Sequence, residues 1–175
     1  MKKDINILID EKTLKKRIEE IAEEISKDYM NEELILVCVL KGAVYYTIDL
    51  SKKIKNDNLF LDFVDVSSYG IGIRSSPGSV NLRLDLNTNI KGKNVIIVED
   101  IIDSGYTLDF LYNHLKSKYP KSIKICVLLD KYEKREVDVK VDYTGFKIED
   151  KFVLGYGLDY DELYRNLNYI GYIEN

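Results

Sequence analysis

The chain has 175 residues, of which 45% are hydrophobic and 32% are charged, and its formal net charge at pH 7 is −4. This length is typical of one domain, residues 1–175, and the composition excludes an intrinsically disordered chain. An acidic balance disfavours broad nucleic-acid binding, so we expect no nucleic-acid partner.

The sequence also indicates where the protein works. No apolar run approaches the ~18 residues that span a bilayer, and the first ten residues, MKKDINILID, contain no signal-peptide core. Cys38 and Cys126 lie within apolar runs, which is typical of buried free thiols in a reducing compartment. We therefore expect a cytoplasmic protein with no membrane partner.

The first half of the chain alternates helical and strand patterns. Apolar residues at helical spacing predict one amphipathic helix over residues 12–30. The nearly continuous apolar run LILVCVL predicts a strand over 34–40 that is covered on both faces. A second helix is expected over 44–55, and a strand over 59–66.

The second half begins with a polar stretch rich in Ser and Gly over 67–79. The alternating segment VNLRLDL predicts an exposed antiparallel strand over 80–86. Buried strands are expected over 94–98 and 122–130, with a helix between them, and the pattern loosens after Lys131. Strands that alternate with helices predict an α/β domain around a mainly parallel sheet.

The stretch KNVIIVEDIIDSGYT (93–107) carries the strongest chemical signal. Glu99 and Asp100 follow an apolar run, at the strand end where α/β sheets bind ligands. The segment from Asp103 to Thr107 then passes through a glycine into a helix, whose free amides and dipole attract an anion. A phosphate beside clustered acids fits a sugar phosphate with Mg²⁺. The alternative is that Asp103 merely caps the helix.

This stretch resembles the signature of the purine phosphoribosyltransferases, enzymes that join a purine base to phosphoribosyl pyrophosphate (PRPP). Four other stretches are similar in the same order: VLKGA (39–43) to the pyrophosphate loop, SSYG (67–70) to the mobile lid, LLDK (128–131) to the base-recognition segment, and DKFVLGYGLDYDELYRNL (150–167) to the purine pocket. The resemblance covers nearly the whole chain. It implies a type I phosphoribosyltransferase fold, with a mainly parallel sheet flanked by helices and a small hood formed by the N- and C-terminal segments.

The resemblance also implies an activity. The enzyme would transfer the 5-phosphoribosyl group from PRPP to N9 of hypoxanthine or guanine, giving IMP or GMP and pyrophosphate. Mg²⁺ would be the cofactor, and a homodimer or homotetramer the assembly. A preference for xanthine stays open, whereas an adenine-specific enzyme is disfavoured because Lys131 suits an oxo group as hydrogen-bond acceptor.

Roles for individual residues follow from the same resemblance. PRPP would be bound by Lys41, Gly42, Glu99, Asp100, Asp103, Ser104, Gly105, Tyr106, Thr107 and Arg165. The purine would be bound by Lys131, Phe152, Val153 and Asp159. The metal would be held by Glu99, Asp100 and Asp159. Lid residues would be Ser68 and Tyr69.

Asp103 is the implied catalytic residue. A 6-oxopurine loses a proton near N7 as the bond to ribose forms at N9, and a carboxylate beside N7 could accept this proton. The single histidine, His114, falls mid-helix and is interpreted as structural. The resemblance further implies a cis peptide bond between Leu40 and Lys41.

The main alternative from another class is a regulator with the same fold that binds RNA. Such regulators typically have a tyrosine at the position of Asp103 and need a basic face for RNA. A chain with an aspartate there and a formal charge of −4 fits neither requirement.

Overall fold

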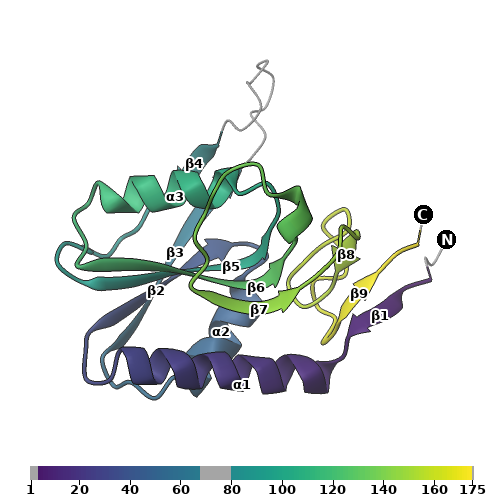
Figure 1. Cartoon of the computed structure of the whole chain (residues 1–175), viewed down its shortest axis with the longest axis horizontal. Coiled ribbons are helices and arrows are strands. Elements are labelled where there is room, and N and C mark those ends of the chain that lie inside the picture. The colour runs from purple at the N-terminus through teal and green to yellow at the C-terminus, as the bar shows by residue number, and fades with distance from the viewer. Residues whose placement is uncertain (1–3, 68–79, 175) are drawn as a thin grey trace.

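The structure is a computed structural model that describes residues 4–67 and 80–174. A six-stranded sheet lies at its centre (Figure 1), with the strand order β4-β3-β2-β5-β6-β7. Its strands are β2 (Leu34–Leu40), β3 (Leu59–Ser67), β4 (Asn81–Leu84), β5 (Asn94–Ile102), β6 (Ser122–Asp130) and β7 (Tyr143–Lys147). Only the β3–β4 pair is antiparallel, so the prediction of a mainly parallel sheet is confirmed.

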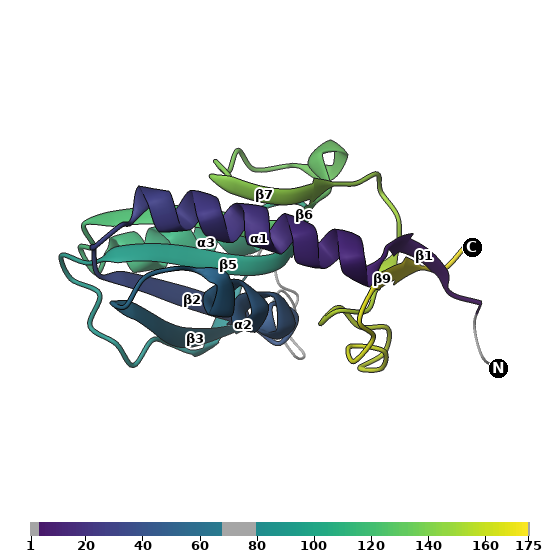
Figure 2. The ribbon, with the colours of Figure 1, turned by 90° about the horizontal axis from the view of Figure 1, so that it is seen from below.

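Helices cover both faces of this sheet. The helices α1 (Glu11–Asp28) and α2 (Val44–Lys53) lie on one face, and α3 (Tyr106–Lys116) lies on the other (Figures 1 and 2). Successive side chains of β2 point to opposite faces, so Leu34 and Leu36 pack into the core under α1, whereas Ile35 packs into the core under α3. This explains the nearly continuous apolar run of β2.

The strand β5 is longer than the sequence predicts. The expected strand ends at Val98, and pairing with β2 does end there, but pairing with β6 continues through Ile102. Glu99 and Asp100 therefore lie within a strand rather than after it. A run of apolar residues marks where a strand is buried, and it does not mark how far a neighbour continues the pairing.

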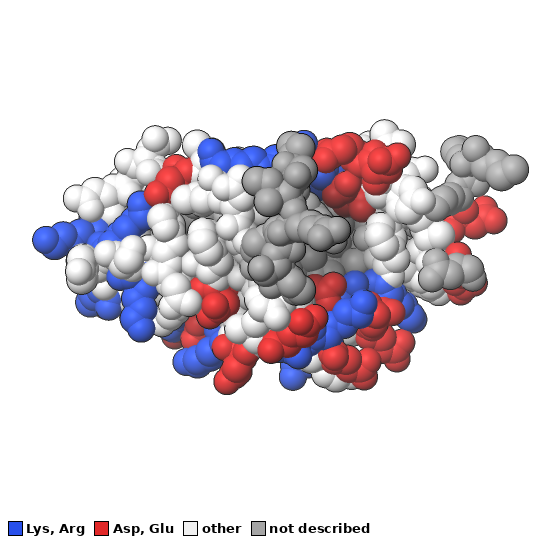
Figure 3. Space-filling model, turned by 90° about the horizontal axis from the view of Figure 1, so that it is seen from above, with Lys and Arg blue, Asp and Glu red and all other residues white. Residues whose placement is uncertain are grey.

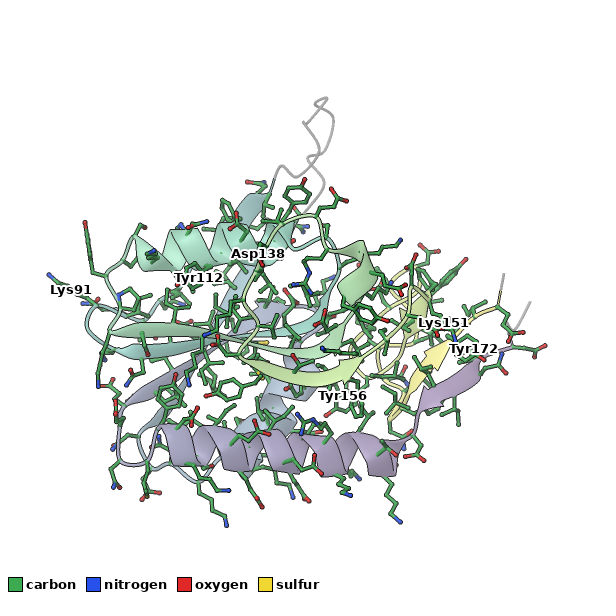
Figure 4. The ribbon with its side chains drawn as sticks, in the orientation of Figure 1. Lys91, Tyr112, Asp138, Lys151, Tyr156 and Tyr172 are labelled. Atoms are coloured by element: carbon green, nitrogen blue, oxygen red, sulfur yellow. The ribbon has the colours of Figure 1, made fainter. Side chains whose placement is uncertain are left out.

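A second, antiparallel sheet joins the two ends of the chain. It has the order β1-β9-β8, from β1 (Asn6–Ile9), β8 (Val153–Leu154) and β9 (Ile170–Tyr172). Figures 1 and 2 show it at one end of the molecule, beside both termini. In Figure 4, Lys151 and Tyr172 lie together there, with the ammonium 5.0 Å from the ring centroid. This small sheet is the predicted hood.

Several smaller expectations can be compared with the structure. Both cysteines are buried, and burial raises the pKa of the Cys38 thiol to about 11 and that of Cys126 to about 12. The cis peptide bond between Leu40 and Lys41 is present. Ser68 and Tyr69 lie outside the described residues. Among the helices of the described ranges, none is long and apolar enough to cross a membrane.

Candidate active site

A cavity of about 610 Å³ opens at the carboxyl ends of β2 and β5. Its wall combines the loop after β2, the end of β5 with the turn into α3, and two side chains from the C-terminal segment. The predicted site residues that meet there are Lys41, Gly42, Glu99, Asp100, Asp103, Ser104, Gly105, Thr107, Asp159 and Arg165. Segments more than 120 positions apart in the sequence thus form one site, as a parallel sheet allows.

The turn into α3 leaves the start of the helix open to an anion. Gly105 is the residue that precedes the helix, and its φ of 97° lies in the left-handed region that favours glycine. No side chain caps this helix. Since the first amides of a helix have no partner within it, they can bind phosphate oxygens. The residue at the N-cap position is therefore Gly105 and not Asp103.

Glu99 and Asp100 form a pair of carboxylates with little access to water. Glu99 is 7% exposed, and burial, reinforced by the neighbouring Asp100 carboxylate, raises the pKa of Glu99 well above its ordinary value of 4.5. Burial also raises the pKa of Asp100. Asp100 lies directly against the loop after β2, because a Cβ added to Gly42 would fall 1.6 Å from its Oδ2 atom.

Such a pair suits a divalent cation, which prefers carboxylate oxygens. Asp159 lines the same cavity, but its carboxylate is 2.8 Å from the guanidinium of Arg165. Within residues 4–67 and 80–174, no three acidic, histidine or cysteine side chains are grouped closely enough to hold a metal by themselves. Glu99 and Asp100 thus fit Mg²⁺ in the manner typical of this ion, with further ligands from water and substrate phosphates.

The two cations predicted for pyrophosphate are held by one carboxylate that the sequence did not single out. The Oε2 atom of Glu162 lies 3.0 Å from Nζ of Lys41 and 3.3 Å from the guanidinium of Arg165. Both contacts lower the pKa of Glu162. Glu162 lies in a turn in which Asp161 and Tyr164 also have positive φ, so local sequence patterns do not predict its place.

Of the residues predicted to bind the base, Asp159 lines this cavity, whereas Lys131, Phe152 and Val153 do not. Lys131 is only 9% exposed, and its Nζ is 3.9 Å from Oδ2 of Asp103. Phe152 is half exposed and packs edge-to-face on Tyr160, with ring centroids 5.3 Å apart. Val153 is buried in β8. The structure therefore connects Lys131 to the cavity through Asp103.

Two further charged residues, Lys134 and Glu136, line the cavity without having been predicted. Lys134 ends a 3₁₀ turn (Tyr132–Lys134), and the backbone amide of Glu136, two residues later, donates to the carbonyl of Ser104 over 3.0 Å. The hydroxyl of Tyr106 donates to the Glu136 carboxylate over 3.2 Å. The predicted site residue Tyr106 thus contacts a residue of the cavity wall, although it does not line the cavity itself. Lys134 and Glu136 both precede the alternating run VDVKV (137–141), in a stretch without a periodic pattern that could have revealed them.

His114 takes no part in the cavity lining. Its ring stacks on Phe110, and Nε2 lies 3.0 Å from the carboxylate of Asp85. Basic and acidic side chains are interspersed on the face of the molecule that Figure 3 shows, in keeping with the small net charge.

Comparison with known proteins decides the family. The model of the phosphoribosyl transferase domain matches residues 5–161. The chain belongs to the phosphoribosyltransferase family. It is 47% identical over 173 residues to the hypoxanthine phosphoribosyltransferase of Buchnera aphidicola, covering 98% of this chain and 97% of the relative. It is 46% identical over 175 residues to the hypoxanthine-guanine phosphoribosyltransferase of Bacillus subtilis, covering 99% and 96%.

Solved structures agree with this assignment. A crystal structure of a hypoxanthine-guanine phosphoribosyltransferase from Bacillus anthracis matches this phosphoribosyltransferase with a TM-score of 0.91 at 44% identity, covering 99% of this chain and 100% of that one. The predicted phosphoribosyltransferase fold is therefore confirmed, and so is the prediction that the chain is a transferase.

Proposed function

We propose that this phosphoribosyltransferase is a purine salvage enzyme that transfers the 5-phosphoribosyl group from PRPP to N9 of hypoxanthine and guanine. The observation that carries the proposal is the 3.9 Å separation between the Asp103 carboxylate and the Lys131 ammonium. N7 and the 6-oxo group are neighbours on one edge of a 6-oxopurine, so a proton acceptor beside a donor matches that edge. The names of the relatives support the same substrates.

In this proposal PRPP lies along the cavity. The amides from Ser104 to Thr107 bind its 5-phosphate at the start of α3, and Glu99 and Asp100 face the ribose hydroxyls. The backbone of Gly42 and the cations Lys41 and Arg165 bind the pyrophosphate. Glu99 and Asp100 would hold Mg²⁺, with Asp159 reaching it through water, and the ion would supply positive charge for the leaving pyrophosphate.

The base is held from the opposite side. Lys131 donates to the 6-oxo group, Phe152 stacks on the ring and the backbone of Val153 reads the far edge. Asp103 accepts the N7 proton as the N9 bond forms. Adenine would present an amino donor to the ammonium of Lys131, so it is not a substrate.

The proposal extends to the whole protein. Residues 1–175 act as one domain, and Ser68 and Tyr69 close over the reaction. The enzyme is a homodimer or homotetramer.

Spectrophotometric assays with PRPP, Mg²⁺ and one base at a time test this function. We expect turnover with hypoxanthine and guanine, release of one pyrophosphate for each nucleotide, and no turnover with adenine. A protein that uses adenine, or none of the 6-oxopurines, would disprove the proposal. Light scattering measures the assembly.

Lys131→Met is expected to raise the KM for hypoxanthine about 10- to 100-fold, because a hydrogen bond from a charged donor is worth about 1.5–3 kcal/mol. The KM for PRPP should stay near its wild-type value, since Lys131 is not among the residues that line the phosphate cavity. Steady-state kinetics with each substrate varied in turn would check both values. Equal losses for the two substrates would contradict the placement of Lys131.

Glu99→Gln is expected to affect affinity and stability in opposite directions. The neutral amide binds Mg²⁺ poorly, so PRPP affinity measured by calorimetry should fall about tenfold or more. In the ligand-free protein the pKa of Glu99 is raised above 4.5, so the folded state binds more protons than the unfolded chain and stability falls as pH rises above that value. The variant lacks this loss.

Thermal unfolding at several pH values measures the second effect. The variant should melt above wild type near pH 7, and the difference should shrink towards pH 4, where the carboxyl is protonated in both states. Glu133→Gln, in the 3₁₀ turn outside the cavity lining, is the matched control. A variant that loses stability at neutral pH and keeps PRPP affinity would refute this role of Glu99.

A further inference from the structure

Lys131 carries its charge at a site with little water. It is 9% exposed, and an ammonium in such a place needs partners of opposite charge. Two carboxylates supply them. The Oδ1 atom of Asp150 lies 3.5 Å from Nζ, within hydrogen-bonding range, and the Oδ2 atom of Asp103 lies 3.9 Å away. Asp150 is thus the nearer of the two.

Asp150 is itself fixed on its other side. Its Oδ2 atom lies 2.8 Å from Nζ of Lys134, and this hydrogen bond lowers the pKa of Asp150, which keeps the carboxylate charged. It also lies two residues before Phe152, on the segment that leads into the hood. One carboxylate therefore connects the loop after β6 with the segment that carries the proposed base-stacking ring.

The separation between Lys131 and Asp103 depends on this arrangement. Without Asp150, Asp103 would be the nearest carboxylate left to compensate the ammonium of Lys131, and the opposite charges would draw the two side chains together. A direct pair between them would occupy both the donor for the 6-oxo group and the acceptor for the N7 proton. Neither would then be available to the base.

We propose that Asp150 is a positioning residue, which holds the ammonium of Lys131 towards the 6-oxo group and away from Asp103. The inference rests on the proposed function, because it needs Lys131 as the donor to the base. It assigns Asp150 no contact with the substrate. Substitution of Asp150 should therefore weaken the binding of ligands that carry the 6-oxo group and leave binding at the phosphate site unchanged.

Two nucleotides that differ by one non-hydrogen atom test the positioning role of Asp150. IMP carries the 6-oxo group, and purine riboside 5′-monophosphate lacks it, while both fill the same phosphate and ribose sites. Calorimetry with Mg²⁺ should show that wild type prefers IMP. In Asp150→Asn the affinity for IMP should fall about tenfold, with the affinity for the analogue unchanged. Asp150→Glu should recover part of the preference, and the KM for PRPP should stay constant.

Glu149→Gln is the matched control, since it removes the adjacent charge from a solvent-exposed side chain that pairs with Lys151. It should bind both nucleotides as wild type does. Equal losses for IMP and the analogue in Asp150→Asn, or an unchanged IMP affinity, would overturn the positioning role. A wild type that does not prefer IMP would instead overturn the proposed contact of Lys131 with the base.

Discussion

Asp103→Asn is expected to lower kcat about 10²–10⁴-fold, the range for loss of a positioned general base. The amide keeps the size of the side chain and loses the site that accepts the N7 proton. kcat/KM for the base should fall by a similar factor, which is the pattern of an interaction made chiefly in the transition state. PRPP affinity should survive, because the amides before α3 and the pair Glu99 and Asp100 remain in place.

The position of Asp103 in the structure simplifies the interpretation of this experiment. α3 is preceded by Gly105 and has no side-chain cap, so Asp103→Asn removes no cap from the helix. Asp109→Asn is the control, because Asp109 lies in the first turn of α3, is not among the residues that line the cavity, and accepts a hydrogen bond from the side chain of Asn113. A loss below about tenfold at Asp103, or an equal loss at Asp109, would exclude the catalytic assignment.

Removal of divalent cations is expected to abolish turnover, with a drop of about 10³-fold or more, and added Mg²⁺ should restore it. The reason lies in the charges of the cavity. Glu99 is buried and Asp100 is half-buried beside it, and a pyrophosphate group would meet both carboxylates without compensation. The cations Lys41 and Arg165 are already paired with acidic side chains.

Two measurements separate a lost cofactor from a damaged protein. Circular dichroism after chelation should match that of the untreated enzyme, since Mg²⁺ is not needed for the sheet or its helices. Calorimetry should show that PRPP binds more weakly without Mg²⁺ than with it. Full turnover in excess EDTA, after metal has been stripped, would show that the acids serve another purpose.

The central sheet could be predicted because its strands are buried on both faces. β2 and β6 appear in the sequence as apolar runs with the bounds that the structure has. The strands β1 and β9 could not be predicted in this way, because each is short and is stabilised by a partner more than 150 positions away. Only the resemblance to a family indicated that the two ends of the chain form a hood.

The residues of the site also differ in how far the sequence could predict them. Glu99 and Asp103 stand out in the sequence because they come after an apolar run and before a glycine turn. Asp150, Glu136 and Glu162 come from irregular segments, in which no period relates one side chain to the next. Their positions depend on backbone contacts between distant loops, and these became visible only in the folded chain.

The contacts of Glu162 have a consequence for how pyrophosphate enters. Without substrate, its carboxylate lies 3.0 Å from Nζ of Lys41 and 3.3 Å from the Arg165 guanidinium, where a phosphate oxygen would otherwise be. Binding is then an exchange of one anion for another within the protein, and it releases few anions to the bulk solution. The affinity for pyrophosphate should therefore depend less on the concentration of added salt than the affinity of a site built from two surface cations without an acidic partner.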